Sequence, residues 1–142
     1  MKRIHIGLEV KDLDASARFY TSLFGADPVV READYAKWLL DDPRLNFSIS
    51  ARAGSEPGDV HFGIQVESEA ELGEVSARLA RAGEALIEEP EAVCCYHKSS
   101  KAWVVDPDAL AWETFHTHGT TTVYGESSAK VAAAREAKRC CD

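Results

Sequence analysis

Two histidines and one glutamate are the residues whose types and placement could hold a metal ion. His5 lies in the segment Ile4–Val10 and His61 in Val60–Val66, and both segments read apolar, His, apolar, Gly, apolar, polar, apolar. This alternation is typical of β-strands that carry the histidine and the glycine on one face and the apolar residues on the other. The glycine beside each histidine leaves room for a bulky group on that face. The repetition predicts a duplicated module with a histidine at the same point in each half.

The third candidate, Glu113, lies in a predicted last strand over Leu110–His116. When the two halves are aligned at their last strands, Ser48 of the first half corresponds to Glu113 of the second. A carboxylate between apolar neighbours requires a partner if it is buried, and a metal ion is one such partner. Each residue alone would be interpreted as hydrogen-bonded or solvated, but the duplicated positions favour a metal site. Two histidines and one carboxylate leave positions open for dioxygen, water or substrate, which favours non-haem Fe(II).

Four cysteines occur as two adjacent pairs, of which the first is Cys94–Cys95. Neither pair has the C-x-x-C spacing of zinc sites. Two adjacent thiols are instead candidates for binding one ligand together. The polar segment His97–Lys101 follows, and its lysines are expected to lower the thiol pKa values if they lie close in space. This segment could move to present the thiols to the iron. The alternative is a pair of small buried apolar residues.

The elements that must position these residues follow one order in both halves. In the first half the spacing predicts a helix over Lys11–Gly25 and strands over Tyr35–Leu40 and Leu45–Ala51, with a turn at Asp41–Pro43. In the second half a capping box at Ser68-x-x-Glu71 begins a helix that Gly83 ends. Three short strands near residues 85–89, 92–96 and 101–105 and a turn at residues 106–108 are expected before the last strand. Each half is therefore a strand, a helix and about three strands, which predicts an α+β fold of two tandem βαβββ modules.

Length and composition limit the class of protein. The chain has 142 residues, 45% of them hydrophobic and 28% charged, which is enough for one domain or for two small modules with a shared core. The formal charge of −8 argues against nucleic acid or an anionic membrane as a partner. No apolar run approaches the ~18 residues of a membrane span, and no signal peptide is visible. A cytoplasmic location is therefore expected.

The histidines, the glutamate and the paired modules resemble those of a known superfamily. The two βαβββ modules, a histidine at the same point of each, and the segment Asp106–Glu113 look like the vicinal-oxygen-chelate superfamily of glyoxalases, bleomycin-resistance proteins and dioxygenases. The resemblance covers about residues 1–118 and implies a cupped mixed sheet. It implies no single reaction, because the superfamily hosts isomerases, thiol transferases, dioxygenases and binding proteins.

A narrower resemblance rests on the adjacent cysteines. The segment Glu91–Trp103, with its Cys pair, resembles the organoarsenical carbon–arsenic lyases and equally the related cadmium-induced proteins. The resemblance implies an Fe(II)-dependent dioxygenase that cleaves the C–As bond of trivalent methyl and aromatic arsenicals and releases arsenite. It also implies the site residues: iron would be held by His5, His61 and Glu113, and arsenic by Cys94 and Cys95. Trivalent arsenic is soft and thiophilic, and a monosubstituted arsenical has two exchangeable positions that two adjacent thiols can fill.

Other functions stay open at this point. The first alternative is a non-catalytic protein of the same fold that sequesters cadmium or arsenite through its cysteines. A glyoxalase-type isomerase is disfavoured, because Ser48 is a poor fourth metal ligand. The sequence leaves open whether methyl or aromatic arsenicals are preferred, and whether the cleft lies within one chain or across a homodimer.

The expected domain spans residues 1–118, with module one at 1–52 and module two at 59–118. Residues 119–142 form a C-terminal tail that could be mobile, within which Val131–Lys138 could form a short helix. Cys140 and Cys141 end this tail and are interpreted as an unstructured end rather than a second arsenical site. His116 and His118 follow Glu113 and are interpreted as surface residues.

Overall fold

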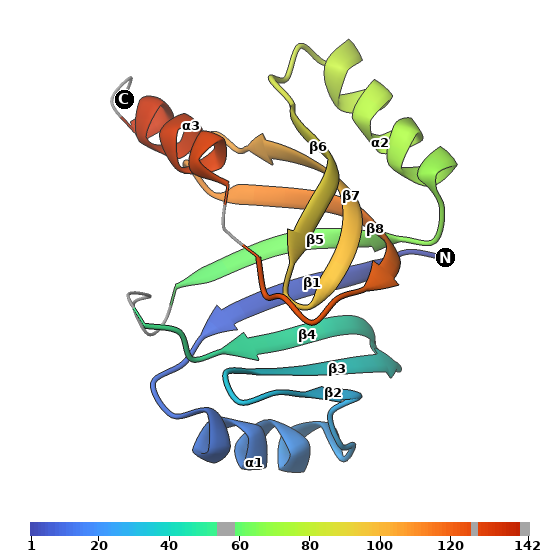
Figure 1. Ribbon diagram of the computed structural model, residues 1–142. Helices are drawn as coiled ribbons and strands as arrows, with labels where there is room; N and C mark the ends of the chain where they lie inside the picture. The colour runs from blue at the N-terminus through green and yellow to red at the C-terminus, as the bar shows by residue number, and fades with distance from the viewer. Residues whose placement is uncertain (54–58, 126–127, 140–142) are drawn as a thin grey trace. The chain divides into compact units, whose positions relative to one another are not determined.

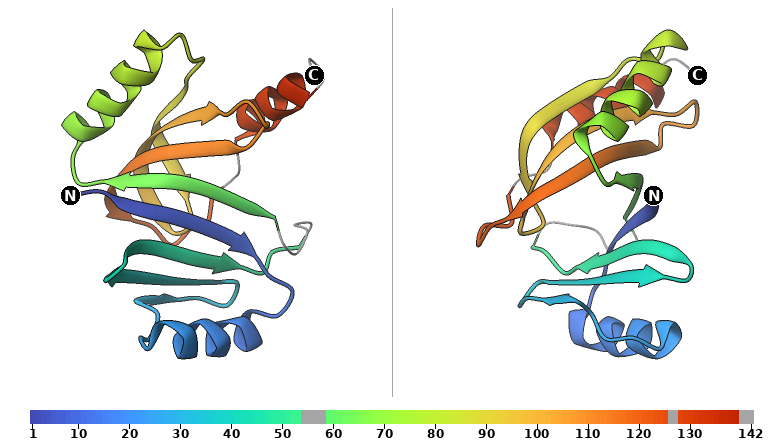
Figure 2. Two further views of the ribbon diagram at one scale, coloured as in Figure 1. Left: turned by 180° about the vertical axis from the view of Figure 1, so that it is seen from behind. Right: turned by 90° about the vertical axis from the view of Figure 1, so that its right-hand side faces the viewer.

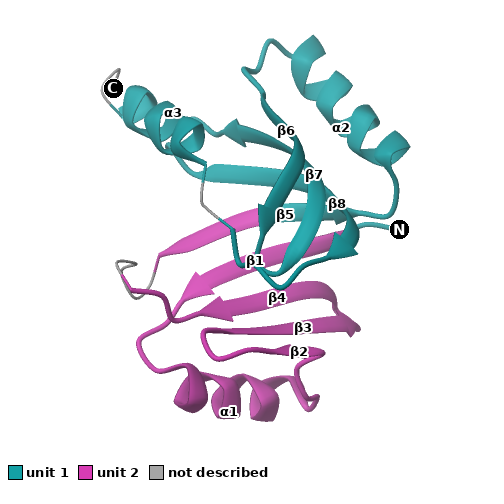
Figure 3. Cartoon of the chain, in the orientation of Figure 1, with its two compact units in different colours: residues 1–2, 63–142 teal, residues 3–62 magenta. Residues whose placement is uncertain are grey.

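The computed structural model describes residues 1–53, 59–125 and 128–139 (Figure 1). The elements in chain order are β1 (Arg3–Glu9), α1 (Leu13–Phe24), β2 (Val30–Arg31), β3 (Tyr35–Asp41), β4 (Arg44–Ser50), β5 (Val60–Val66), α2 (Glu69–Arg81), β6 (Ile87–Cys94), β7 (His97–Val105), β8 (Ala111–Thr120) and α3 (Ala129–Arg139). The chain divides into two compact units, residues 3–62 and residues 1–2 with 63–142, and the division falls inside β5 (Figure 3).

The strands belong to one mixed sheet in the order β2-β3-β4-β1-β5-β8-β7-β6. Strand β1 pairs with β4 in parallel, while β3 with β4, β6 with β7 and β7 with β8 pair antiparallel. Each half contributes a strand, a helix and three strands, so the predicted α+β class and the tandem βαβββ modules are confirmed.

Two details of the second module differ from the sequence prediction. The three short strands expected between residues 85 and 105 are two longer strands, because a two-residue turn joins β6 to β7 at Cys95–Tyr96. The last strand continues to Thr120 instead of ending at His116, because its pairing with β7 extends to the pair His97–Thr120.

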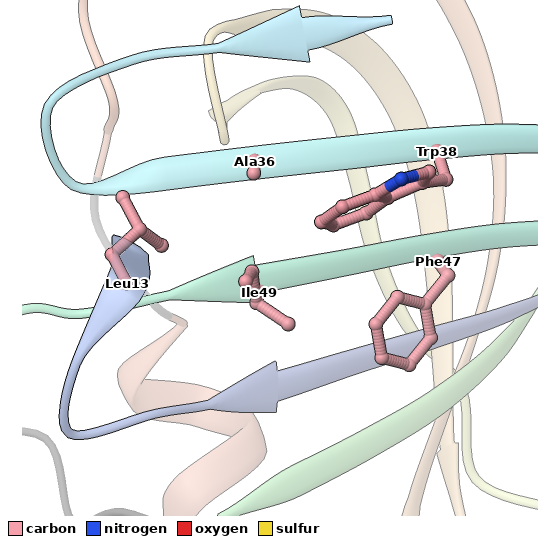
Figure 4. Packing of buried hydrophobic residues seen from close by; sticks show 5 residues of the cluster. All are labelled: Leu13, Ala36, Trp38, Phe47 and Ile49. Carbon is pink, nitrogen blue, oxygen red and sulfur yellow. The ribbon is translucent and has the colours of Figure 1, made fainter. Parts of the chain in front are cut away.

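In the unit of residues 3–62, α1 lies beside the strands of its own unit (Figure 2), and its apolar side chains pack against β3 and β4. The Asp12 side chain accepts a hydrogen bond from the Ala15 N–H at 2.9 Å and so caps the first turn. Gly25 ends the helix in a left-handed conformation with φ 65°, as predicted. Figure 4 shows the buried residues at the centre of this core, which are Leu13, Ala36, Trp38, Phe47 and Ile49.

In the unit that contains residues 63–142, α2 begins at the predicted capping box. The Ser68 hydroxyl accepts from the Glu71 N–H at 3.2 Å, and the Glu71 carboxylate accepts from the Glu67 N–H at 2.9 Å. Leu72 packs with Val66 and Ala102 in the core of this unit. Among the described residues, no helix has the length and apolar character needed to cross a membrane.

The C-terminal segment forms α3, which covers the stretch where a short helix was expected. Val131 is 7% exposed, and the Arg135 side chain donates from Nε to the Ala109 carbonyl at 3.1 Å. These contacts pack α3 on its own unit, a packing for which the sequence alone contained no requirement. Cys140 and Cys141 lie outside the described residues.

Candidate active site

Strands β1 and β5 bring His5 and His61 together, as the repeated pattern predicts. The two Nε2 atoms lie 3.1 Å apart, and His5 is 6% exposed. His5 Nδ1–H donates to the Asn46 carbonyl on β4 at 3.1 Å, which leaves the Nε2 lone pair of His5 available to a metal. A metal with bonds of about 2.1 Å to two imidazole nitrogens at right angles places those nitrogens about 3.0 Å apart. The observed spacing fits such an ion.

The two glycines of the repeat, Gly7 and Gly63, leave space for the side chains of other candidate metal ligands. A Cβ on Gly7 would lie 2.1 Å from Cε1 of His61, and a Cβ on Gly63 would lie 2.6 Å from Cγ of Glu113. Real Cβ atoms do not come this close to another heavy atom. The bulky group predicted to lie over each glycine is therefore the side chain of another candidate ligand.

Replacing Gly7 with alanine should displace the His61 ring and weaken metal binding by at least ~10-fold, as expected when a ligand loses its orientation. The measurement is Fe(II) affinity under anaerobic conditions. Gly73→Ala on α2 is the matched control, because no atom lies within 4 Å of its added Cβ, and it should bind Fe(II) like the unmodified chain. Equal affinity in both variants would show that the ring tolerates the methyl group.

Glu113 lies on β8 and is 2% exposed. Its Oε2 atom accepts a hydrogen bond from Lys101 Nζ of β7 at 2.8 Å. Lys101 is 9% exposed. Burial is the largest influence on Lys101 and lowers its pKa, but the Glu113 carboxylate, the two cysteines and the hydrogen bond to Glu113 together hold that pKa above its ordinary value. Removing one member of such a buried pair costs about 3–5 kcal/mol, because the other charge is left buried without its partner.

Among the described residues, His5, His61 and Glu113 form a candidate metal site. One nitrogen or oxygen atom from each residue lies within 4.8 Å of the others. Two imidazole nitrogens and one carboxylate oxygen are the donors of the two-histidine, one-carboxylate sites that hold divalent iron. The donor set therefore fits the expected group.

The thiol pair lies at the turn between β6 and β7. The sulfur atoms of Cys94 and Cys95 are 2.9 Å apart without a disulfide bond between them, and both residues are half-buried. Cys95 and Tyr96, the two central residues of this turn, have φ values of 58° and 63°. Glycine or asparagine usually occupies such positions, and neither is present here. Each of these conformations costs on the order of 1–3 kcal/mol. The residues His97–Lys101, expected to form a movable polar segment, belong to strand β7.

The electrostatics of the pair differ from the sequence prediction. The hydrogen bond with Cys94, then burial, raise the pKa of the Cys95 thiol well above its usual value. The positive charge of Lys101 acts in the opposite direction, as predicted for the lysines, but is the weaker influence. Cys95 is therefore a neutral thiol near pH 7, because the predicted lowering of its pKa by Lys101 is present but is outweighed. The Lys101 ammonium is close enough to act on both Glu113 and the two cysteines.

Three residues of this region were not recognised in these roles from the sequence. Asn46 orients His5 through its carbonyl oxygen, and Lys101 forms an ion pair with Glu113. Tyr124 contacts Cys95 from beyond the last strand. The position of Lys101 at the start of an apolar stretch that ends at Val105 indicates a buried charge pair. No sequence pattern indicates which backbone carbonyl orients a histidine. His116 bonds to Glu69 at 3.1 Å on the outer part of β8, in agreement with a surface role.

Comparison with known proteins places the chain in a family. The family model described as Glyoxalase/Bleomycin resistance protein/Dioxygenase superfamily matches residues 2–114. The chain is 45% identical over 124 residues to the trivalent organoarsenical cleaving enzyme of Bacillus sp. (strain MD1), covering 84% of this chain and 76% of that protein. It is 31% identical over 143 residues to the cadmium-induced protein CadI of Mycobacterium bovis (strain ATCC BAA-935 / AF2122/97), covering 100% of this chain and 94% of that protein.

Solved structures show the same fold. The Mn(II)-bound glyoxalase of Novosphingobium aromaticivorans superposes with a TM-score of 0.56 at 21% identity. The match covers 92% of this chain and 44% of that longer chain. At this identity the likeness concerns the fold alone, and it confirms the expected vicinal-oxygen-chelate fold.

Proposed function

Because the chain belongs to the glyoxalase/bleomycin resistance protein/dioxygenase superfamily, we propose that it is an Fe(II)-dependent dioxygenase that cleaves the carbon–arsenic bond of trivalent organoarsenicals and releases arsenite. The relatives named trivalent organoarsenical cleaving enzymes support an enzyme that acts on this substrate class. In this proposal His5, His61 and Glu113 hold the iron, and Cys94 and Cys95 bind the arsenical.

One observation carries the proposal: a single buried cation, Lys101, acts on both the thiol pair and the candidate metal ligand. Lys101 donates to Glu113 at 2.8 Å, and its charge also acts on Cys94 and Cys95. The thiols that would bind arsenic and the carboxylate that would bind iron are therefore both near the Lys101 ammonium. Positioning a substrate beside the reacting centre is the main contribution that a protein makes to such chemistry.

The neutral thiol of Cys95 suits this substrate. A trivalent arsenical carries two hydroxyl groups, and each thiol that bonds to arsenic loses its proton as the arsenic loses a hydroxide, so that two water molecules leave. No charge accumulates in this exchange, and a raised pKa of Cys95 is compatible with it. The sulfur atoms lie 2.9 Å apart, so both can bond to one arsenic atom.

Bound Fe(II) would supply the binding and activation of dioxygen. The chain's own residues position the candidate iron ligands: Asn46 bonds to His5, Gly7 leaves space for the His61 ring, and Lys101 forms an ion pair with Glu113. For the methyl substrate, one CH3As(OH)2 and one O2 balance as one As(OH)3 and one CH2O. The proposal therefore predicts equal amounts of arsenite and formaldehyde per oxygen consumed.

The experiment is anaerobic loading with Fe(II), followed by methylarsonite with and without air. We expect arsenite, measured by mass spectrometry, only when both iron and air are present, with formaldehyde in equal amount. The chain without iron is the control in air. Arsenite formed without air, or no arsenite under any condition, would contradict the dioxygenase.

A second candidate is a non-catalytic protein that sequesters cadmium or arsenite. The full-length similarity to the cadmium-induced proteins of Mycobacterium favours it. This function needs the thiols alone, so it predicts arsenite or cadmium binding without oxygen consumption. The experiment above separates the two functions, because a binding protein would retain methylarsonite unchanged in air.

A further inference from the structure

The segment Thr121–Gly125, which we call the post-β8 segment, runs beside the turn that carries the thiol pair (Figure 1). The Cys95 N–H donates to the Tyr124 carbonyl at 2.6 Å, and the Thr121 N–H donates to the Tyr96 carbonyl at 3.0 Å. Gly125 also forms a β-bridge with Cys94. The post-β8 segment therefore both accepts a hydrogen bond from the backbone of the turn and donates one to it.

One side chain of the same segment, that of Tyr124, reaches the thiol pair. The thiol of Cys95 lies 3.6 Å from the hydroxyl oxygen of Tyr124 and donates to it. The rings of Tyr96 and Tyr124 meet edge to face, with their centroids 5.5 Å apart. Tyr124 is thus the residue of this segment that contacts the Cys95 sulfur directly.

The turn itself is one that its residues disfavour. Cys95 and Tyr96 both have positive φ, where a side chain crowds the following carbonyl. Such conformations persist only where surrounding structure imposes them. The hydrogen bonds from the post-β8 segment satisfy the N–H of Cys95 and the carbonyl of Tyr96, so the segment supplies the contacts that hold the turn.

We propose that the post-β8 segment is a clamp on the thiol pair, and that Tyr124 is a positioning residue that orients the Cys95 sulfur for a trivalent arsenical. The proposal rests on the proposed arsenic-binding role of the two cysteines. Both sulfurs must point at one arsenic atom, and a turn without its clamp would let the Cys95 side chain rotate away. Holding the sulfurs in place before the ligand arrives removes an ordering cost from binding.

Four groups set the chemistry of Cys95. The Cys94 thiol and the Lys101 ammonium act on its sulfur, His97 bonds through Nδ1 to the Cys95 carbonyl at 2.6 Å, and Tyr124 contacts the sulfur. When Cys95 is ionised, the Tyr124 hydroxyl can donate to the thiolate and lower its pKa. Removing that hydroxyl should therefore raise the pKa of Cys95 further, while the other three groups stay in place.

The first test is Tyr124→Phe, which keeps the ring against Tyr96 and removes the hydroxyl. We expect the affinity for phenylarsine oxide, a trivalent monosubstituted arsenical, to fall about fivefold, which corresponds to one lost hydrogen bond. The pH profile of Cys95 alkylation by iodoacetamide, followed by tandem mass spectrometry, should shift to higher pH. Tyr20→Phe on α1 is the matched control and should change neither value.

The second test displaces the post-β8 segment without changing a tyrosine side chain. A Cβ on Gly125 would lie 1.7 Å from the Val93 carbonyl oxygen, so Gly125→Ala must push the post-β8 segment away from β6. A Cβ on Gly119 would lie 3.7 Å from Lys98 Cβ, an ordinary contact, so Gly119→Ala is the matched control. Gly125→Ala should weaken phenylarsine oxide binding more than Tyr124→Phe does, and Gly119→Ala should not weaken it.

The outcomes separate this inference from the proposed function, because binding and alkylation are measured without turnover. If the unmodified chain binds phenylarsine oxide and Tyr124→Phe and Gly125→Ala bind it equally well, the clamp is overturned while the arsenical site stands. If the unmodified chain does not bind phenylarsine oxide, the arsenic-binding role itself is overturned. An alkylation profile unchanged in Tyr124→Phe would overturn the positioning role of Tyr124.

Discussion

Serine in place of Cys94 or Cys95 should abolish arsenite release while the protein keeps its iron. A hydroxyl oxygen is too hard a ligand for trivalent arsenic, so each variant should lose at least about 100-fold in arsenical affinity, or about 2.7 kcal/mol. The candidate iron ligands are His5, His61 and Glu113, on β1, β5 and β8, so the substituted turn should leave the iron content unchanged. Iron content, phenylarsine oxide affinity and arsenite release are measured on the same preparations.

The control for the thiol variants is the double variant Cys140→Ser and Cys141→Ser, which alters the other adjacent pair of the sequence. It should keep most of the activity. Full turnover in Cys94→Ser and Cys95→Ser would remove the arsenic-binding role. Loss of iron in either variant would instead make the pair metal ligands and favour the binding protein.

Alanine in place of His5, His61 or Glu113 should remove nearly all bound Fe(II) and all lyase activity. Three protein ligands leave none to compensate for a lost one, and each side chain supplies one donor to the candidate site. Fe(II) content after anaerobic loading and desalting is the first measurement, and arsenite release is the second. His118→Ala is the matched control, because His118 is exposed and is expected to leave the iron content unchanged.

Glu113 needs a second variant, because alanine also leaves the buried Lys101 without its carboxylate, at a cost of about 3–5 kcal/mol in unfolding free energy. Glu113→Gln keeps the size of the side chain and an oxygen that can accept from Lys101. We expect this variant to fold and still to bind little Fe(II), because a neutral amide is a weaker ligand than a carboxylate. Full iron and full turnover in Glu113→Gln would show that Glu113 is not a ligand.

The identity of the candidate ligands follows from the sequence alone. The pattern around His5 recurs around His61, and only a strand with alternating faces produces such a repeat. The structure places both residues on strands, at β1 and β5. The start of helix α2 could also be predicted from the sequence, because capping depends on residues only three apart, such as Ser68 and Glu71.

The strand boundaries of the second module could not be predicted. The turn at Cys95–Tyr96 contains no glycine, proline or asparagine, so local sequence carries no turn signal there. The post-β8 segment meets this turn from about 29 residues further along the chain, as the contact between Cys95 and Tyr124 shows. Contacts at such separation depend on how the strands pair and not on any local pattern.

The sequence by itself therefore determined the module order, the three candidate metal ligands and the candidate thiol pair, because these depend on residue type and on periodicity along one strand or helix. Tertiary structure alone decided what surrounds them. It placed Lys101 on Glu113, filled the space at Gly7 with the His61 ring, and raised the pKa of Cys95 where neighbouring lysines predicted the opposite. The physical reason is that burial and neighbouring charges set these properties, and both arise only when distant segments pack together.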